Sequence, residues 1–273
     1  MQAASREALK QVRTEVDSVL GRFSSTDGMS ALAQELYAVA GLLTGQPPLR
    51  RRLADPASPV EARTGLLARL LEGKVSASAL TVTKAAVSHR WSSAWDLVDA
   101  LELGGDEVLL AAAEKTGTLD NVEDELFRLE RIIDSESAFA TLLDETSAPA
   151  DRRVQLLNTV IGSKVSPLTL ALAEHAVVTE RKRSIRLALD DLIEGAAARR
   201  ERSVARVVSA VAMTDAQQSA LAEKLTEMYG RRIDVRYGID ASIRGGLVVR
   251  VGDEVIDGSI TTRLIQIRGA LSG

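Results

Sequence analysis

Apolar side chains recur at helical spacing through the first two hundred residues of the chain. Leu32, Leu36, Val39 and Leu43 follow one another at intervals of three or four residues, which places them on one helix face. Equivalent stripes predict further helices, among them 4–23, 77–89, 93–116 and 167–180. Gly104 and Gly105 interrupt the long predicted helix 93–116, and we expect a weak point there.

The helical pattern is repeated once along the chain. When the sequence is shifted by ninety residues, positions 30–100 lie over 120–190 without a gap, and fourteen of the pairs are identical. Pro59 matches Pro149, and the run 74–76 matches 164–166. These matches fall outside the helical period, which disfavours the alternative of two unrelated helical segments. We therefore expect the two copies to share one fold, with Ser58 as an N-cap before Pro59 in the first helical turn.

The pattern changes near residue 202, where strands are predicted in place of helices. Segment 203–211 is a predicted strand, and 233–237 alternates apolar and polar residues as a half-buried strand does. Segment 245–251 is predicted as a further strand, followed by a tight turn and a short return strand, 254–256. Thr214 to Gln217 form a capping box for a helix expected to bury Leu221, Leu225 and Met228. A final helix is expected after Asp257. The predicted fold is mainly α: two tandem helical bundles, 1–105 and 106–200, precede a small α+β domain, 201–273.

Composition excludes several classes of function. The chain has no Cys and two His, so disulfides, thiol catalysis and Cys- or His-rich metal sites are not expected. Its net charge of −4 and its aromatic content of 3% argue against nucleic-acid binding. No apolar run reaches membrane-spanning length, and the charged N-terminus does not resemble a secretory signal. We expect a soluble cytoplasmic chain without cofactor or metal.

The charged and glycine-rich motifs have structural interpretations that outweigh catalytic ones. The glycines around 245–258 border a hairpin and do not form a phosphate-binding loop. Acidic runs 123–125 and 190–191 are consecutive, so we expect solvated helix surface there, and His89 and His175 are expected to be structural or exposed. Basic runs 50–52, 181–183 and 199–202 are expected to be solvated helix ends, with an acidic partner as the alternative.

One stretch resembles a known family. The sequence from Gly245 to Ser259 is similar to the signature of the delta subunit of F-type ATP synthases, the oligomycin sensitivity conferral protein family. The signature positions are Gly245, Gly246, Gly252, Asp253, Asp257 and Gly258. The resemblance extends over about 106–273, and the first helical copy is similar to the long form found in high-GC Gram-positive bacteria. Without a membrane anchor, the chain resembles the unfused form.

The resemblance implies a non-catalytic stator subunit at the cytoplasmic face of the cell membrane. Such a subunit holds the catalytic head through N-terminal helices of alpha subunits and contacts the peripheral-stalk b subunit. Carried over by position, the alpha groove lies between 106–116 and 167–180. Its expected lining residues are Leu109, Leu110, Leu170, Ala173 and Val177. We expect Ala173→Asp to weaken partner binding without unfolding the chain. A helical-repeat adaptor unrelated to ATP synthase remains the alternative, and an enzyme using the hairpin is a weaker one.

Overall fold

The computed structural model describes residues 2–179, 184–202, 204–229, 233–240, 243, 245–251 and 254–258. Contacts divide the chain into two compact units, Met1–Ala196 and Ala197–Gly273. The helices of the first unit, the last of which extends past its boundary, are α1 (Ala3–Leu20), α2 (Thr26–Gly45), α3 (Pro47–Ala54), α4 (Val60–Leu71), α5 (Ala77–Ser88), α6 (Ala94–Lys115), α7 (Leu119–Ser135), α8 (Ser137–Asp144), α9 (Ala150–Ile161), α10 (Pro167–Val178) and α11 (Ile185–Arg202). This first unit is the helical unit below.

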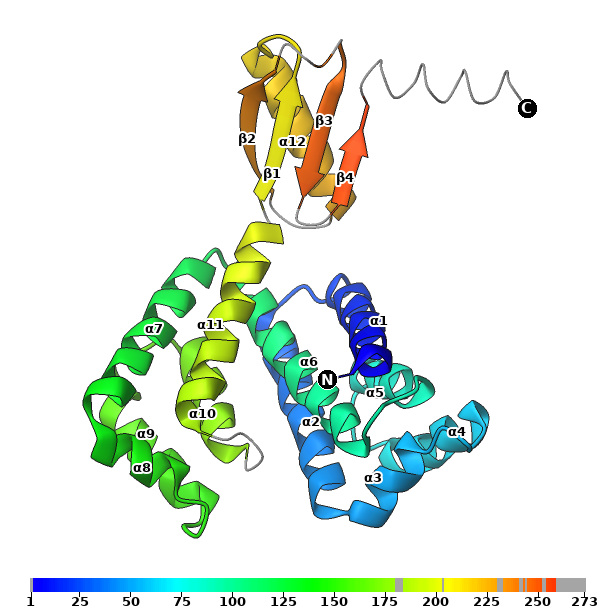
Figure 1. Ribbon diagram of the computed structural model, residues 1–273, viewed down its shortest axis with the longest axis vertical. Coiled ribbons are helices and arrows are strands. Elements are labelled where there is room, and N and C mark those ends of the chain that lie inside the picture. The colour runs from blue at the N-terminus through cyan, green and yellow to red at the C-terminus, as the bar shows by residue number, and fades with distance from the viewer. Residues whose placement is uncertain are drawn as a thin grey trace. The chain divides into compact units, whose positions relative to one another are not determined.

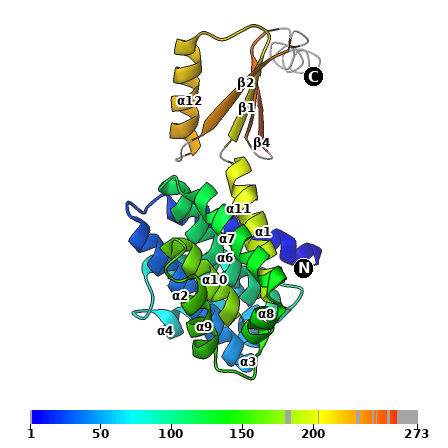
Figure 2. The same cartoon turned by 90° about the vertical axis from the view of Figure 1, so that its left-hand side faces the viewer.

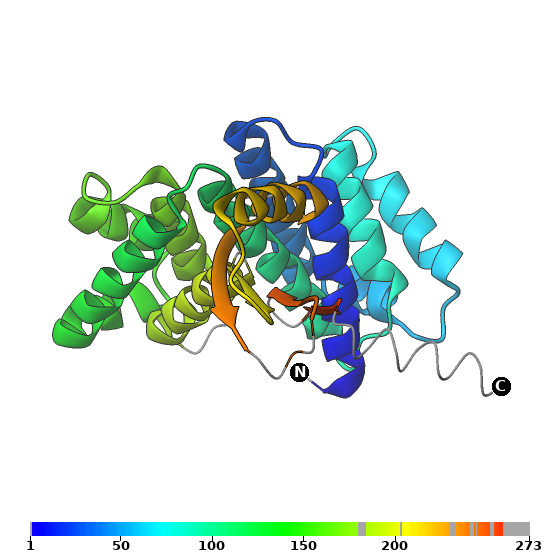
Figure 3. The same ribbon diagram turned by 90° about the horizontal axis from the view of Figure 1, so that it is seen from above.

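The two copies of the repeat have the same order of helices. Helices α3, α4 and α5 begin and end ninety residues before α8, α9 and α10. Helix α6 belongs to both copies, because the same shift carries α1 onto α6 and α6 onto α11. Figure 3 shows the blue and cyan helices of the first copy on one side of the helical unit and the green helices of the second on the other. The expected division at residues 105/106 falls inside this shared helix.

Helix α6 is the centre of the helical unit. It contacts α1, α2, α3 and α5 of the first copy and α7 and α10 of the second (Figure 1). Gly104 and Gly105 do not weaken it: the helix is continuous, and both glycines are buried. A Cβ on Gly105 would overlap the ring of Tyr37 in α2. The glycine pair therefore serves close helix packing, which corrects the expectation of a weak point.

The starts of α4 and α9 differ from the predicted capping. Pro59 and Pro149 occupy the N-cap positions with extended backbone, one residue before the helices begin. Ser58 does not cap α4. Its hydroxyl instead donates a 2.8 Å hydrogen bond to Asp55. The proline still fixes where the helix begins, because its ring holds φ near the helical value and its missing N–H costs nothing there.

The second unit contains a four-stranded sheet and one long helix. Its elements are β1 (Val204–Ser209), α12 (Asp215–Tyr229), β2 (Asp234–Ile239), β3 (Leu247–Val251) and β4 (Glu254–Asp257). The strand order is β2-β1-β3-β4; β1 and β2 are parallel, and the other pairs are antiparallel. Helix α12 lies on one side of the sheet (Figure 2). Thr214 and Gln217 form the predicted capping box, with backbone-to-side-chain bonds of 2.9 and 3.3 Å.

The small unit has its own core, formed by alternate residues of the strands and one face of α12. Ala205, Val207, Val249 and Val251 are buried together with Leu225. Leu221 is partly buried against them, whereas Met228 is 55% exposed, so its predicted burial is wrong. Met228 has the helical spacing of this stripe but lies in the last turn of α12, which ends at Tyr229. The expected final helix lies outside the described residues.

Candidate functional site

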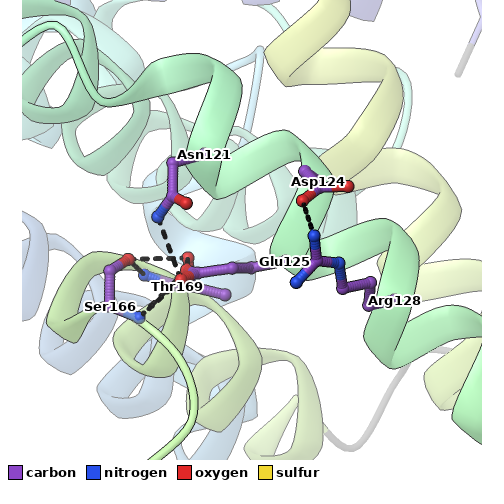
Figure 4. A network of polar contacts seen from close by, with 6 residues as sticks. All are labelled: Asn121, Asp124, Glu125, Arg128, Ser166 and Thr169. Atoms are coloured by element: carbon purple, nitrogen blue, oxygen red, sulfur yellow. Dashed lines mark hydrogen bonds and ion pairs between the residues drawn. The ribbon is translucent and has the colours of Figure 1, made fainter.

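Helix α10 is held at its N-terminus by a partly buried polar network. The Glu125 carboxylate of α7 accepts hydrogen bonds from the Ser166 backbone N–H at 2.9 Å and from the Thr169 hydroxyl at 2.5 Å. Asn121 donates a further bond of 2.9 Å from one turn earlier on α7 (Figure 4). A carboxylate here satisfies an otherwise unpaired N–H and complements the positive end of the helix dipole.

The pKa of Glu125 reflects this network. Burial raises the pKa by opposing the charged form, but the hydrogen bonds from Thr169, Ser166 and Asn121 together outweigh it and lower the pKa below the ordinary glutamate value. Its neighbour Asp124 instead forms an exposed 2.6 Å ion pair with Arg128. The expectation of solvated helix surface is therefore wrong for Glu125.

The first copy contains the same arrangement ninety residues earlier. Glu35 of α2 accepts bonds from the Ser76 backbone N–H at 2.9 Å and from the Ser76 hydroxyl at 2.5 Å. Ser76 and Ser166 also cap α5 and α10 directly, by accepting from Ala79 and Thr169 N–H groups. The matched run 74–76 and 164–166 thus has a physical cause, because it supplies the serine that starts the fifth helix of each copy.

The C-terminus of the same helix is held by a buried arginine. Arg153 of α9 donates a 2.7 Å hydrogen bond to the carbonyl oxygen of Val177, and Arg63 of α4 donates an equal one to Val87. Both arginines are buried. The last carbonyls of a helix lack partners within it and carry partial negative charge, so a cation is favoured there. An acid at one end and an arginine at the other fix the position of α10.

The predicted groove residues lie mainly in the core. Leu109, Leu110, Ala173 and Val177 are at most 2% exposed, whereas Leu170 is half-buried. A Cβ on Gly195 of α11 would meet the Leu110 side chain at 3.3 Å, so α11 covers that position. These four side chains contact the chain's own helices and offer no open surface. A charge at Ala173 is therefore expected to destabilise the fold, contrary to the expectation from sequence.

Tyr37 of α2 connects the two copies beside these buried positions. Its ring stacks on His175 of α10, with centroids 3.5 Å apart, and its hydroxyl donates a 2.8 Å bond to Asp106 of α6. Burial and then the Asp106 charge raise the pKa of Tyr37 well above its ordinary value, so the hydroxyl keeps its proton. The matching residue of the second copy, Phe127, is 49% exposed. The contact is therefore specific to the seam between copies.

An open cleft follows this seam. It has a volume of about 570 Å³ and lies between one face of α2 and facing residues of α6, α9 and α10. Its lining residues are Gln34, Tyr37, Gly41, Thr44, Gly45, Glu102, Val154, Ala171, Glu174, His175, Val178 and Thr179. Two exposed apolar side chains lie on the helices that form its main walls: Leu42 on α2 and Val178 on α10. Small residues on both walls leave room for the side chains of a helix docked between them.

The lining of the cleft carries acidic groups and contains no Lys or Arg. Glu102 is buried, and Glu174 accepts a 2.7 Å bond from the Asn158 amide. His175 is the remaining ionisable side chain besides Tyr37. A cleft lined by apolar and acidic side chains favours an amphipathic helix that carries basic residues beside its apolar face.

The basic runs have different roles in the structure. Arg50 is buried and is not a solvated helix end: its guanidinium lies 3.4 Å from the Trp95 ring centroid and donates to the Leu43 carbonyl. Arg51 and Arg52 are exposed, as expected. Arg199 is buried as well, and the run 181–183 lies outside the described residues.

The signature hairpin has a backbone role in the described positions. Gly245 and Gly246 have φ values of +101° and +83°, which other residues rarely adopt. Gly258 donates its N–H to the Leu247 carbonyl at 2.9 Å and closes the β3–β4 pair, and Asp257 ends β4. Gly252 and Asp253 lie outside the described residues. None of the described helices is long and apolar enough to cross a membrane, and the described side chains include no cluster suited to a metal ion.

Comparison with known proteins identifies the family. The sequence model described as ATP synthase delta (OSCP) subunit matches residues 107–271, from inside α6 through the second unit. The chain belongs to this family. The match covers the second helical copy and the sheet, so the family's helical domain corresponds to α6–α11, and the first copy is additional to it.

Relatives of the same length share the additional copy. The chain is 39% identical over its full length to all of an ATP synthase subunit delta of Streptomyces griseus, and 42% identical to all of one of Corynebacterium urealyticum. A third relative, from Streptomyces coelicolor, is 43% identical over 97% of this chain and 96% of its own. A chain of the Toxoplasma gondii mitochondrial ATP synthase aligns with a TM-score of 0.30 at 18% identity, over 62% of this chain and 95% of that one.

Proposed function

We propose that this chain is a non-catalytic peripheral-stalk subunit of a proton-translocating F-type ATP synthase. It acts at the cytoplasmic face of the cell membrane, where it links the catalytic head to the stalk b subunit and resists rotor torque. Family membership over residues 107–271 supports this proposal. A static link needs docking surfaces of fixed position rather than reacting groups. Helix α10 provides such a surface, because Glu125 and Arg153 hold its two ends in place.

The cleft beside Tyr37 is the proposed docking site for the N-terminal helix of an alpha subunit. Ala171 and Glu174 in its α10 wall lie on either side of Ala173 in the sequence, and the family resemblance placed Ala173 in the groove wall. The first copy contributes one wall through α2, and the second contributes the other through α10. In this arrangement the additional copy is part of the docking site, and the alpha helix contacts both copies at once.

Filling the cleft tests this proposal. A Cβ on Gly41 would meet nothing within 4 Å, so Gly41→Phe places a ring in the cleft without disturbing the fold. We expect this variant to bind a peptide of the alpha N-terminus at least tenfold more weakly in calorimetry, because the ring occupies the peptide's place. Gly65 of α4 is equally open and lies outside the cleft lining, so Gly65→Phe is the matched control.

The outcomes separate the site from the function. If Gly41→Phe binds the peptide as tightly as the Gly65→Phe control, the cleft is not the alpha site. If the unaltered chain neither binds the peptide nor co-purifies with a membrane ATPase, the stator function fails, and a helical-repeat adaptor becomes the better explanation. We also expect the pure chain neither to bind nor to hydrolyse ATP, since the described residues contain no phosphate loop; a micromolar nucleotide site would contradict this.

A further inference from the structure

Three arginines form a continuous row across the face of the sheet opposite α12. Arg206 of β1 is in register with Arg236 of β2 on one side and with Arg250 of β3 on the other. All three are exposed, while their sequence neighbours Ala205, Val207, Val249 and Val251 face the core. The next position in the row, on β4, is Val255, which is 50% exposed. These four residues are called the arginine row below.

The row is unfavourable in the chain by itself. Like charges directly opposite one another on adjacent strands destabilise a sheet, and here one arginine lies between two others. None of the three makes an ion pair or side-chain hydrogen bond with a described residue. The acids Asp234 and Asp257 share this face only on the edge strands, two residues away from the row. An external group that neutralises the row would remove this repulsion.

Charge along the chain favours an acidic partner over an internal one. The second unit carries 12 basic and 9 acidic residues, whereas the first carries 22 and 29. Residues 259–273 contain Arg263 and Arg268 and no acid, so this segment cannot neutralise the row. The half-buried Val204, Val208 and Val248 border the arginines on the same face. Alternating apolar and cationic positions match a helix with an apolar stripe flanked by carboxylates.

We propose that the arginine row is the docking surface for an acidic amphipathic helix of the stalk b subunit. This inference rests on the proposed function. It adds which face of the second unit binds the b subunit and that the bound helix is acidic. Carboxylates of the helix pair with Arg206, Arg236 and Arg250, while its apolar stripe covers Val255 and the bordering valines. Forked arginine–carboxylate pairs also fix the orientation of the helix on the sheet.

Charge reversal in the full-length chain tests this inference. The probe is the soluble helical part of the b subunit, titrated in calorimetry against the unaltered chain, Arg206→Glu and Arg206→Glu/Arg250→Glu. We expect about tenfold weaker binding for the single variant and a larger loss for the double variant. Raising salt should weaken binding by the unaltered chain much more than by the double variant. Folding should be retained, because the substitutions relieve repulsion at exposed positions, and thermal unfolding checks this.

Two controls make the result specific. Arg51→Glu/Arg52→Glu makes the same charge change at exposed positions of the helical unit and should leave b binding unchanged. Arg206→Lys keeps the charge but loses the forked geometry, so it should bind b more tightly than Arg206→Glu and more weakly than the unaltered chain. If both row variants bind b like the unaltered chain, the inference is overturned while the stator function stands.

Two further outcomes are decisive. If the unaltered chain does not bind b at all, both the inference and the b contact in the proposed function are overturned. If instead the chain binds anionic lipid vesicles and Arg206→Glu abolishes only that binding, the row recognises a membrane and not an acidic helix.

Discussion

The guanidinium of Arg153 donates a 2.7 Å hydrogen bond to the carbonyl oxygen of Val177, near the C-terminus of α10. Ninety residues earlier, Arg63 makes the same contact with Val87 at the same distance. The Nε of each arginine has no hydrogen-bond partner among the described residues, so both arginines are held in one orientation by their terminal nitrogens alone. The two copies of the repeat therefore share the same contact between an arginine and a carbonyl at a helix end, and in both copies the arginine Nε is the atom without a partner among the described residues.

Removing either arginine should destabilise the helical unit. Arg153→Leu leaves the Val177 carbonyl without its charged donor, and we expect a loss of about 2–3 kcal/mol in the free energy of unfolding. Arg63→Leu should cost a similar amount. Urea unfolding measures both, and Arg152→Leu, at the exposed neighbouring position, should change the free energy by less than about 0.5 kcal/mol. Equal losses at Arg152 and Arg153 would show that the carbonyl contact contributes nothing.

A methyl group at Gly105 should destabilise the seam between the copies. The new Cβ would overlap the Tyr37 ring, which also stacks on His175 and therefore cannot move freely. We expect Gly105→Ala to cost about 1–3 kcal/mol despite the higher helix propensity of alanine. Gly65→Ala is the control, because its Cβ would meet nothing within 4 Å, and it should gain up to about 1 kcal/mol. Thermal unfolding that ranks both variants above the unaltered chain would refute the close contact.

The helices, the repeat and most strands could be predicted from the sequence because each depends on local periodicity. The polar contacts of the fifth helix could not. Arg153 binds a backbone carbonyl 24 residues away, and a carbonyl leaves no residue-specific signal in the sequence. Glu125 lies in an acidic run that resembles solvated surface until the folded chain brings Ser166 beside it.

The burial of the predicted groove residues could not be predicted from the sequence, for a different reason. An apolar stripe has the same pattern whether the chain's own helix or a partner covers it, so Leu109 and Leu110 could have lined either a core or a groove. Matching positions of the two copies differ in burial for this reason: Tyr37 is 8% exposed, whereas Phe127 is 49% exposed. The difference is created by the neighbouring copy, which packs only on the first of them.

Glu125 should make the stability of the helical unit dependent on acid. Its pKa is lowered in the folded chain, so its contribution is fully present above the ordinary glutamate pKa and is lost as the pH falls through the lowered value. We expect the unaltered chain to be more stable than Glu125→Gln at pH 7, and this advantage to shrink below about pH 4.5. Unfolding measured across this range checks it. An advantage that is constant with pH would mean that the carboxylate charge plays no part.

Glu130 of α7 should have the opposite effect at neutral pH. The carboxyl group of Glu130 shares a hydrogen bond with the carboxyl group of Asp190 in α11. This bond raises the pKa of Glu130 most, followed by burial and by the negative charges of Asp190 and Asp134, whereas the charge of Arg186 lowers it. A raised pKa means that the contribution to stability is present below the ordinary glutamate value and is lost as the pH rises through the raised one. At pH 7 the two carboxylates therefore repel one another.

Glu130→Gln removes this repulsion and keeps a donor for Asp190. We therefore expect the variant to be more stable than the unaltered chain by up to about 0.5 kcal/mol, a gain limited by solvent screening. The gain should shrink as the pH falls and the Glu130 carboxylate takes up its proton. A variant less stable than the unaltered chain at pH 7 would show that Glu130 is held mainly by its attraction to Arg186.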